Sequence, residues 1–184
     1  MSTKKKVGRR AWVIRAGKKG SAHDLFMTGL VALEDAHMKD LSKLKSTRDA
    51  FYEKYRKKHS EESRSGSAGI AGKFFRFANE INLKDIVLYP CRLDKAVYIG
   101  EISGQYSFEP TSDFPHQRKV KWNWVEPKSS FEIQTQYELG AARTLFEFKK
   151  NLPEVLSLVA AETLPAFTLE NAPAQPKRQS RSAK

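Results

Sequence analysis

The sequence predicts an α+β domain, because segments with the apolar pattern of strands occur together with segments that have the spacing of amphipathic helices. Residues 86–89 are apolar at both parities, as in a strand that is covered on both faces. Ile70, Phe74, Phe77 and Ile81 recur at helical spacing, which predicts a helix over 69–82 that packs on a sheet. At 184 residues and 40% hydrophobic content, the chain can form one sizeable core.

The other elements follow from strand patterns, capping residues and turns. Residues 11–15 and 30–33 are typical of short strands, separated by a glycine-rich turn at 17–20 and a helix that Ser21 caps and that ends near residue 28. Ser46, with Asp49 three residues later, favours a helix start, and we expect a polar loop over 60–69. Further strands are expected at 96–103, 118–125 and 143–149, and Pro153 begins a last helix that ends near residue 162.

The domain organisation follows from the same patterns. We expect a basic arm over 1–10, one domain over 11–164 and a disordered basic tail over 165–184 that is rich in Ala, Pro, Gln and Ser. No internal repeat is visible.

The composition points to a phosphate-rich partner. Lys and Arg number 33 against 21 Asp and Glu, which gives a net charge of +12, and such a balance favours polyanions. A generically basic protein would have the same charge. The single cysteine, Cys91, excludes an internal disulfide framework and a zinc site built from several thiolates, which fits a reducing cytoplasm. Residues 1–10 lack the apolar stretch of a secretory signal, and no apolar run would span a bilayer, so we expect a cytoplasmic protein with no membrane partner.

Two adjacent strand-like segments, 97–110 and 116–124, combine aromatic rings with cations. Flat rings and phosphate-binding cations are what a protein needs to hold an unstacked base. Strand parity predicts that Val120, Trp122 and Trp124 share one face, and that Lys119, Lys121 and Asn123 share the other. The alternative is that both tryptophans are ordinary core residues of a sheet.

Five short motifs carry a resemblance to a known family: WVIRAG (12–17), AGKFFRF (71–77), LKDIV (83–87), YIGEISGQY (98–106) and PHQRKVKW (115–122). In this order they resemble the amino-terminal modules of Mrr-type restriction endonucleases, which are similar to the EVE, YTH and PUA group of small barrels. The resemblance covers roughly residues 11–150. It implies a small, strongly curved mixed sheet or barrel of five or six strands with flanking helices, which binds nucleic acid and, in the EVE and YTH branches, takes up a modified base.

The chain departs from that pattern at two motifs. Some relatives have a Gly-Trp pair after the second strand, where this chain has Leu33, Glu34 and Asp35, so one aromatic wall is missing or comes from elsewhere. Lys84 and Asp85 replace the Gly-Asp pair that commonly precedes the third strand. We expect no nuclease domain of the kind that follows this module in restriction enzymes.

These observations predict a set of site residues. The side chains expected to form a base pocket are Trp12, Ser103, Gln105, Tyr106, Trp122 and Trp124. The groups expected to bind phosphates are Arg15, Lys18, Lys19, Ser21, His116, Arg118, Lys119 and Lys121. A solvated loop is the alternative for the segment 17–21, whose spacing does not meet the phosphate-loop pattern.

An enzymatic function has one supporting fragment. Glu147 and Lys149 match the Glu-x-Lys half of a metal-dependent nuclease site, but the nearest upstream acidic candidate, Asp113, lies in a loop between prolines. The four histidines show no metal-ligand spacing, and no covalent nucleophile is indicated. We therefore expect neither catalytic residues nor a metal or cofactor.

The sequence as a whole favours a non-catalytic module that recognises a flipped, modified base in DNA rather than RNA, as part of a restriction or defence system. A separate nuclease or effector protein is a further partner that this context implies. The alternative function is a protein-binding adaptor or inhibitor of a nuclease effector.

Overall fold

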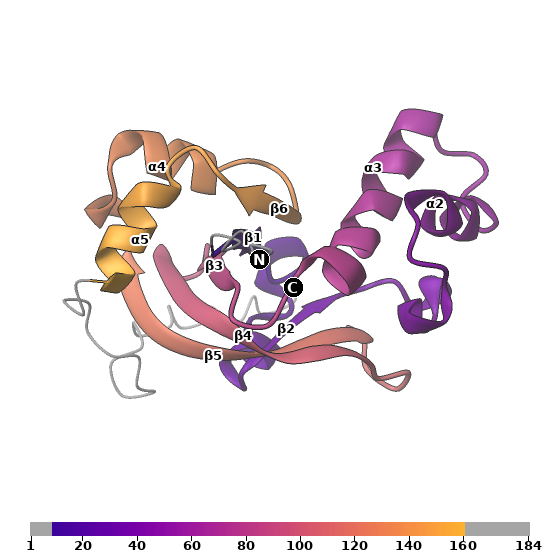
Figure 1. Ribbon diagram of the computed structural model, residues 1–184, viewed down its shortest axis with the longest axis horizontal. Coiled ribbons are helices and arrows are strands. Elements are labelled where there is room, and N and C mark those ends of the chain that lie inside the picture. The colour runs from indigo at the N-terminus through magenta and orange to yellow at the C-terminus, as the bar shows by residue number, and fades with distance from the viewer. Residues whose placement is uncertain (1–8, 161–184) are drawn as a thin grey trace, which may run out of the picture.

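The computed structural model describes residues 9–160 and confirms an α+β fold with a mixed sheet and flanking helices. Six strands form one sheet in the order β2-β5-β4-β3-β1-β6. Their bounds are Ala11–Ile14 for β1, Leu30–Leu33 for β2, Ile86–Pro90 for β3, Ala96–Phe108 for β4, His116–Pro127 for β5 and Leu145–Phe148 for β6. The long strands β4 and β5 bend into an arc beneath the other elements (Figure 1).

The first strand lies inside the sheet, between partners that are distant in the sequence. β1 pairs in parallel with β3, with Trp12 opposite Val87, and antiparallel with β6, with Trp12 opposite Glu147. β2 and β6 are therefore the edges of the sheet. This arrangement brings the end of β1 next to the residues that precede β6.

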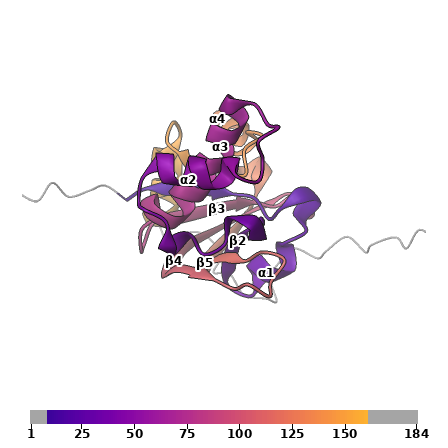
Figure 2. The ribbon, with the colours of Figure 1, turned by 90° about the vertical axis from the view of Figure 1, so that its right-hand side faces the viewer.

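The helices cover both faces of the sheet. They are α1 (His23–Met27), α2 (Arg48–Arg56), α3 (Arg64–Phe75), α4 (Ile133–Leu139) and α5 (Leu152–Ala160), and a π-helical turn, η4 (Arg76–Glu80), continues α3. Helix α2 packs against α3 on one side of the molecule (Figure 2). The rings of Phe51 and Phe75 meet edge to face there, with their centres 5.4 Å apart. Helices α4 and α5 lie at the other end of the sheet (Figure 1).

Several helix starts differ from the prediction because another residue provides the cap. Thr47, not Ser46, caps α2 by accepting a hydrogen bond from the Ala50 amide. Ser63 caps α3, so the helix begins inside the segment 60–69 that was predicted as a loop. Ser21 is not a cap, since α1 begins after Ala22 without a side-chain bond. Helix α4 was not predicted.

The core consists of two apolar clusters, one on each face of the sheet. Alternate strand residues divide between them, as the pleat requires: Trp12 and Val87 belong to one cluster, and Val13 and Ile86 belong to the other. Helices α1, α2 and α3 cover the first cluster, and α4 and α5 cover the second. The prediction that residues 86–89 are covered on both faces is confirmed.

Two irregularities interrupt the pairing of β4 with β5. Ile99 pairs with Trp124 and Gly100 pairs with Trp122, so Asn123 is an extra residue in β5. Ile102 pairs with Val120 but Tyr106 pairs with Arg118, which makes 103–105 a longer bulge in β4. A bulge with one extra residue, such as that at Asn123, reverses the side-chain parity beyond it, and bulges increase the local bend.

The terminal predictions fall mostly outside the described residues. Only Arg9 and Arg10 of the predicted arm are described, and they form ion pairs with Glu101 and Glu147 respectively. The predicted tail, 165–184, lies entirely outside. Between residues 9 and 160, none of the helices has the length and apolarity that a membrane crossing requires.

Candidate nucleic-acid interface

A cleft of 690 Å³ separates α3 from β6, and we call it the basic cleft. Its α3 wall consists of Gly69, Ile70, Lys73 and Arg76, which recur every three or four residues and so share one helix face. Its other wall comes from Arg143, Thr144 and β6, including Glu147 and Lys149. The walls are far apart in the sequence, and the pairing of β1 with β6 brings them together.

The cleft has an excess of positive charge. Glu147 is its one acidic lining residue, and that carboxylate is bound by Arg10 and by Lys149 at 2.8 and 2.9 Å. Among residues 9–160, the side chains of Lys73, Arg76 and Arg143 have no ion-pair partner. Three cations therefore remain available to an anionic ligand.

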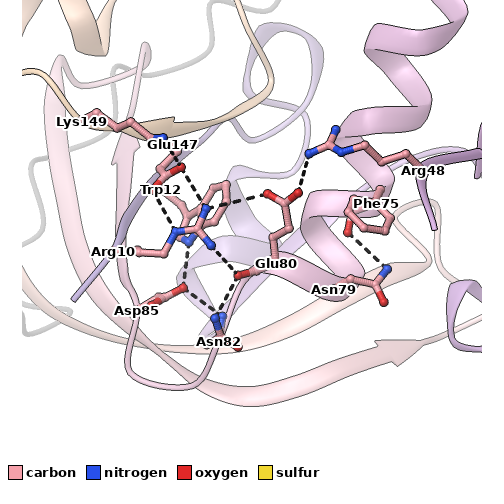
Figure 3. A network of polar contacts seen from close by, with 10 residues as sticks. All are labelled: Arg10, Trp12, Arg48, Phe75, Asn79, Glu80, Asn82, Asp85, Glu147 and Lys149. Carbon is pink, nitrogen blue, oxygen red and sulfur yellow. Dashed lines mark hydrogen bonds and ion pairs between the residues drawn. The ribbon is translucent and has the colours of Figure 1, made fainter. Parts of the chain in front are cut away.

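A polar network holds the base of the cleft together (Figure 3). Arg10 donates both to Glu147 on β6 and to the Glu80 main-chain oxygen at the end of η4, and its guanidinium lies 4.5 Å from the Trp12 ring. Glu80 in turn accepts from Arg48 of α2. The hydrogen bond from Arg10 lowers the pKa of Glu147 to about 2. The network thus fixes β6 relative to the helices that form the opposite wall.

A smaller cavity of 190 Å³, the inner pocket, lies next to the basic cleft and shares Lys73 and Thr144 with it as lining residues. Its other lining residues are Arg15, Gly17, Lys18, Ala32, Leu33, Glu34 and Phe114. They come from the ends of β1 and β2 and from the loop between β4 and β5. The pocket therefore combines an aromatic ring, an exposed carboxylate and several cations.

Lys73 lies between the two cavities. Burial lowers the pKa of its ammonium, although the carboxylates of Asp35 and Glu34 act in the opposite direction. The ammonium lies 4.6 Å from the centre of the Phe74 ring and has no hydrogen-bond or ion-pair partner within the described part of the chain. A partly buried cation without a neutralising partner gains from binding an anion.

Two predicted pocket rings are core residues instead. Trp12 is fully buried and its indole donates to Asp85 at 2.8 Å, while Trp122 is 7% exposed and donates to the Phe26 oxygen. Neither ring can stack on a base in this conformation, so the prediction that they line a base pocket is wrong. The alternative, that they are ordinary core residues, describes them correctly.

Trp124 does not share a face with Trp122, contrary to the parity prediction. The extra residue Asn123 reverses the alternation, so Trp122 belongs to the first apolar cluster and Trp124 packs against the second. The sequence alone does not reveal this bulge. Trp124 is partly buried and lines neither cavity.

Tyr106 is held by hydrogen bonds. Its hydroxyl accepts from the Leu41 amide at 3.0 Å and donates to Nδ1 of His116, whose Nε2 donates to the Asp35 oxygen. Burial raises the pKa of Tyr106 to about 12. Ser103 and Gln105 are exposed in the adjacent bulge and line neither the cleft nor the inner pocket. The predicted set of pocket residues is thus dispersed.

Two predicted phosphate ligands are buried. His116 is 0% exposed, and burial lowers its pKa. Arg118 is 1% exposed and donates to the main-chain oxygens of Phe77, Ala78 and Gly104, while burial lowers its pKa to about 10. Both side chains stabilise the fold and cannot reach a phosphate here, so these two predictions are wrong.

The remaining predicted cations divide between two surfaces. Arg15 and Lys18 line the inner pocket, although Arg15 also donates to the Leu139 and Ala141 oxygens at the end of α4. Lys119 and Lys121 are exposed on β5 and line neither cavity. Two further predicted ligands, Lys19 and Ser21, are exposed beside the turn. Their binding roles stay predictions.

The basic cleft itself was not predicted. Lys73, Arg76 and Arg143 looked like ordinary charged residues of a helix and a loop, because nothing local indicates that β6 lies beside β1. The available signal was the i, i+3 spacing of Lys73 and Arg76 within a helical pattern of apolar residues, together with the Glu147 and Lys149 pair. The structure instead gives Glu147 ion-pair partners in Arg10 and Lys149, and no cluster of acidic, histidine or cysteine side chains suited to a metal occurs between residues 9 and 160.

Comparison with known proteins places the chain in a family. The model of a family described as a domain of unknown function, DUF8426, matches residues 12–149. The chain belongs to the DUF8426 family. This DUF8426 match includes both walls of the basic cleft and the inner pocket.

Other comparisons add little about the DUF8426 chain. A search of curated proteins found no match. Among solved structures, the YTH domain of the Zygosaccharomyces rouxii MRB1 protein, in complex with N6-methyladenosine RNA, is 15% identical, covers 88% of this chain and 92% of its own, and has a TM-score of 0.45. That likeness is too weak to assign a ligand. None of these findings supports the resemblance to Mrr-type modules.

Proposed function

We propose that this chain is a non-catalytic nucleic-acid-binding module, in which the basic cleft holds the sugar-phosphate backbone and the inner pocket takes one flipped base. The observation that carries the proposal is that the two cavities are neighbours, with Lys73 and Thr144 lining both. Unpaired cations in the cleft can bind phosphates, whose release of counterions supplies most non-specific affinity. The net charge of +12 supports the same class of ligand.

The inner pocket has the size and chemistry for a single base. A cavity of about 150 Å³ accommodates benzene, so the 190 Å³ here gives room for one substituted ring. Phe114 offers a ring for stacking, and Glu34 offers acceptors for the N–H groups of a base edge. Base extrusion costs a few kcal/mol, which stacking and edge contacts must offset. A modified base in DNA remains the ligand that we propose.

Gly69 offers a precise test of the cleft. A Cβ at this position would meet no atom within 4 Å, so Gly69→Ala, Gly69→Glu and Gly69→Arg should all fold, and each removes a helix-weakening glycine. We expect Gly69→Glu to weaken binding of random duplex and single-stranded DNA about threefold to tenfold. The dependence of log affinity on log salt concentration should become less steep by about the contribution of one phosphate contact. Gly69→Arg should strengthen binding, and Gly69→Ala is the matched control.

Charge reversals on the β4–β5 hairpin and in the basic cleft decide between two docking faces. Lys119→Glu with Lys121→Glu changes the hairpin surface, while Arg76→Glu with Arg143→Glu changes the cleft. Fluorescence anisotropy at several salt concentrations, with circular dichroism as the check of folding, compares the two. The proposal predicts a large loss only for the cleft pair. A loss confined to the Lys119 and Lys121 pair would place the nucleic acid on the hairpin instead.

The inner pocket needs a test that separates base recognition from phosphate binding. Replacing a stacking ring by Ala costs about 1 to 3 kcal/mol per base, so Phe114→Ala should weaken binding of the preferred modified oligonucleotide about tenfold to a hundredfold. Binding of unmodified duplex should change little. Matched DNA and RNA oligonucleotides with and without base modifications identify the ligand. Equal losses on all substrates would remove the base-reading role and leave only backbone binding.

A further inference from the structure

A third cavity, of 520 Å³, lies beside the end of β4 and shares no lining residue with the basic cleft or the inner pocket. We call it the apolar pocket. It is lined by Ala36, Met38, Leu44, Phe108 and Pro110, and by Lys39, Asp40, Lys43 and Lys54. These residues come from 36–44, from α2 and from the end of β4. The cavity thus combines an apolar surface with three ammonium groups.

The charges around the apolar pocket are unbalanced. The lysines at 39, 43 and 54 have no ion-pair partner among residues 9–160, and Asp40 is the one acidic group in the lining. The Asp40 carboxylate faces its own turn, where it accepts from the amide and the hydroxyl of Ser42 at 3.0 and 2.7 Å. A net positive pocket remains, complementary to carboxylates on a ligand.

The wall of the apolar pocket is held in place from the core. The Asp35 oxygen accepts from His116, and the Leu41 amide donates to Tyr106, so the segment between them is bound at both ends. Asp35 and Lys39 have backbone φ values of 98° and 53°, which residues other than glycine rarely adopt unless the surroundings impose them. A site whose wall is already ordered loses less entropy when a ligand binds.

We infer that the apolar pocket binds a short acidic segment of a partner protein, with one or two apolar side chains inserted between the lysines. The lining favours a peptide over a base, because its apolar residues, among them Met38, Leu44 and Pro110, would leave the polar edge of a base without partners. Aliphatic or aromatic side chains have no polar groups that would lose hydrogen bonds there, and methionine adapts its shape to them. The separate location leaves the basic cleft open when the peptide is bound.

Peptide arrays on the full chain test this inference. The probes are ten-residue peptides with a fixed Asp/Glu frame and each apolar residue in turn at two central positions, and the control peptides carry Ser at both positions. The protein variant is Lys39→Gly with Lys43→Gln and Lys54→Gln, since glycine suits the φ value at position 39. The second variant, Arg76→Glu with Arg143→Glu, controls for binding in the cleft.

We expect selected apolar peptides to bind at least about tenfold more tightly than their Ser controls, as buried apolar anchors do. The triple lysine variant should lose this binding, and the cleft variant should keep it, with both proteins folded by circular dichroism. Saturating single-stranded DNA should not displace the peptide. Equal binding of apolar and Ser peptides, or no binding across the array, would overturn the inference. If the triple lysine variant loses oligonucleotide binding instead, the pocket belongs to the nucleic-acid surface.

Discussion

Arg118 donates from Nε to the main-chain oxygen of Phe77 at 2.7 Å, and this bond ties β5 to the π-helical turn that ends α3. The same guanidinium reaches the oxygens of Ala78 and Gly104. Within residues 9–160 no carboxylate forms an ion pair with this buried guanidinium, so three carbonyl dipoles stabilise its charge.

We therefore predict that Arg118→Lys lowers the free energy of unfolding by about 3 kcal/mol, because one ammonium cannot reproduce the planar set of bonds. Urea denaturation measures the loss, and the exposed neighbour replaced in Lys119→Arg is the control. If Arg118→Lys were as stable as the wild type, the hydrogen bonds from the guanidinium to the three carbonyls would not contribute to the stability of the fold.

Tyr106 gives a second prediction, which separates structure from recognition. Tyr106→Phe leaves the Leu41 amide and His116 Nδ1 without their partner, and an unsatisfied buried group costs about 1 to 3 kcal/mol. Thermal unfolding should show that loss while DNA binding at the inner pocket stays unchanged. A selective loss of modified-base binding in a fully stable Tyr106→Phe protein would restore the recognition role that the sequence indicated.

Gly100 provides a third prediction at the first bulge. A Cβ there would lie 2.6 Å from the Lys121 main-chain oxygen and 2.8 Å from the Trp122 ring, and the strand cannot move away without breaking the β4–β5 pairing. We expect Gly100→Ala to destabilise the fold by about 1 to 3 kcal/mol, as overpacking does. Gly69→Ala, where a Cβ has open space, is the matched control in chemical denaturation.

The fourth prediction concerns acid stability. Arg10 holds the pKa of Glu147 near 2 instead of 4.5, so the ion pair stabilises the fold above pH 4.5 and loses its effect as the pH falls toward 2. The full shift corresponds to about 3 kcal/mol, which solvent screening of the partly exposed pair reduces. The difference in unfolding free energy between wild type and Glu147→Gln should shrink between pH 5 and about pH 2. A difference that is constant with pH would contradict this role.

Local signals in the sequence identified all six strands of the sheet, because period-two patterns and covered apolar runs depend on neighbouring residues. They failed where one residue changes the geometry: Asn123 reverses the parity of Trp124, and Thr47 replaces Ser46 as the cap. They failed again where a charged side chain is buried against main-chain oxygens, as at Arg118. The basic cleft could not be predicted, because the position of β6 beside β1 is a property of the whole sheet.

The central position of β1 also has a consequence for how the chain acquires its structure during synthesis. Arg10, which precedes β1, and Glu147, which lies within β6, are 137 residues apart, so β1 leaves the ribosome long before its last partner exists. At roughly 5 to 20 residues per second, the wait is about 7 to 27 s. Apolar β1 residues stay open to aggregation for that time, and pairing across so long a sequence separation is a slow step in folding. Rapid overexpression should therefore yield more insoluble protein than slow expression at low temperature.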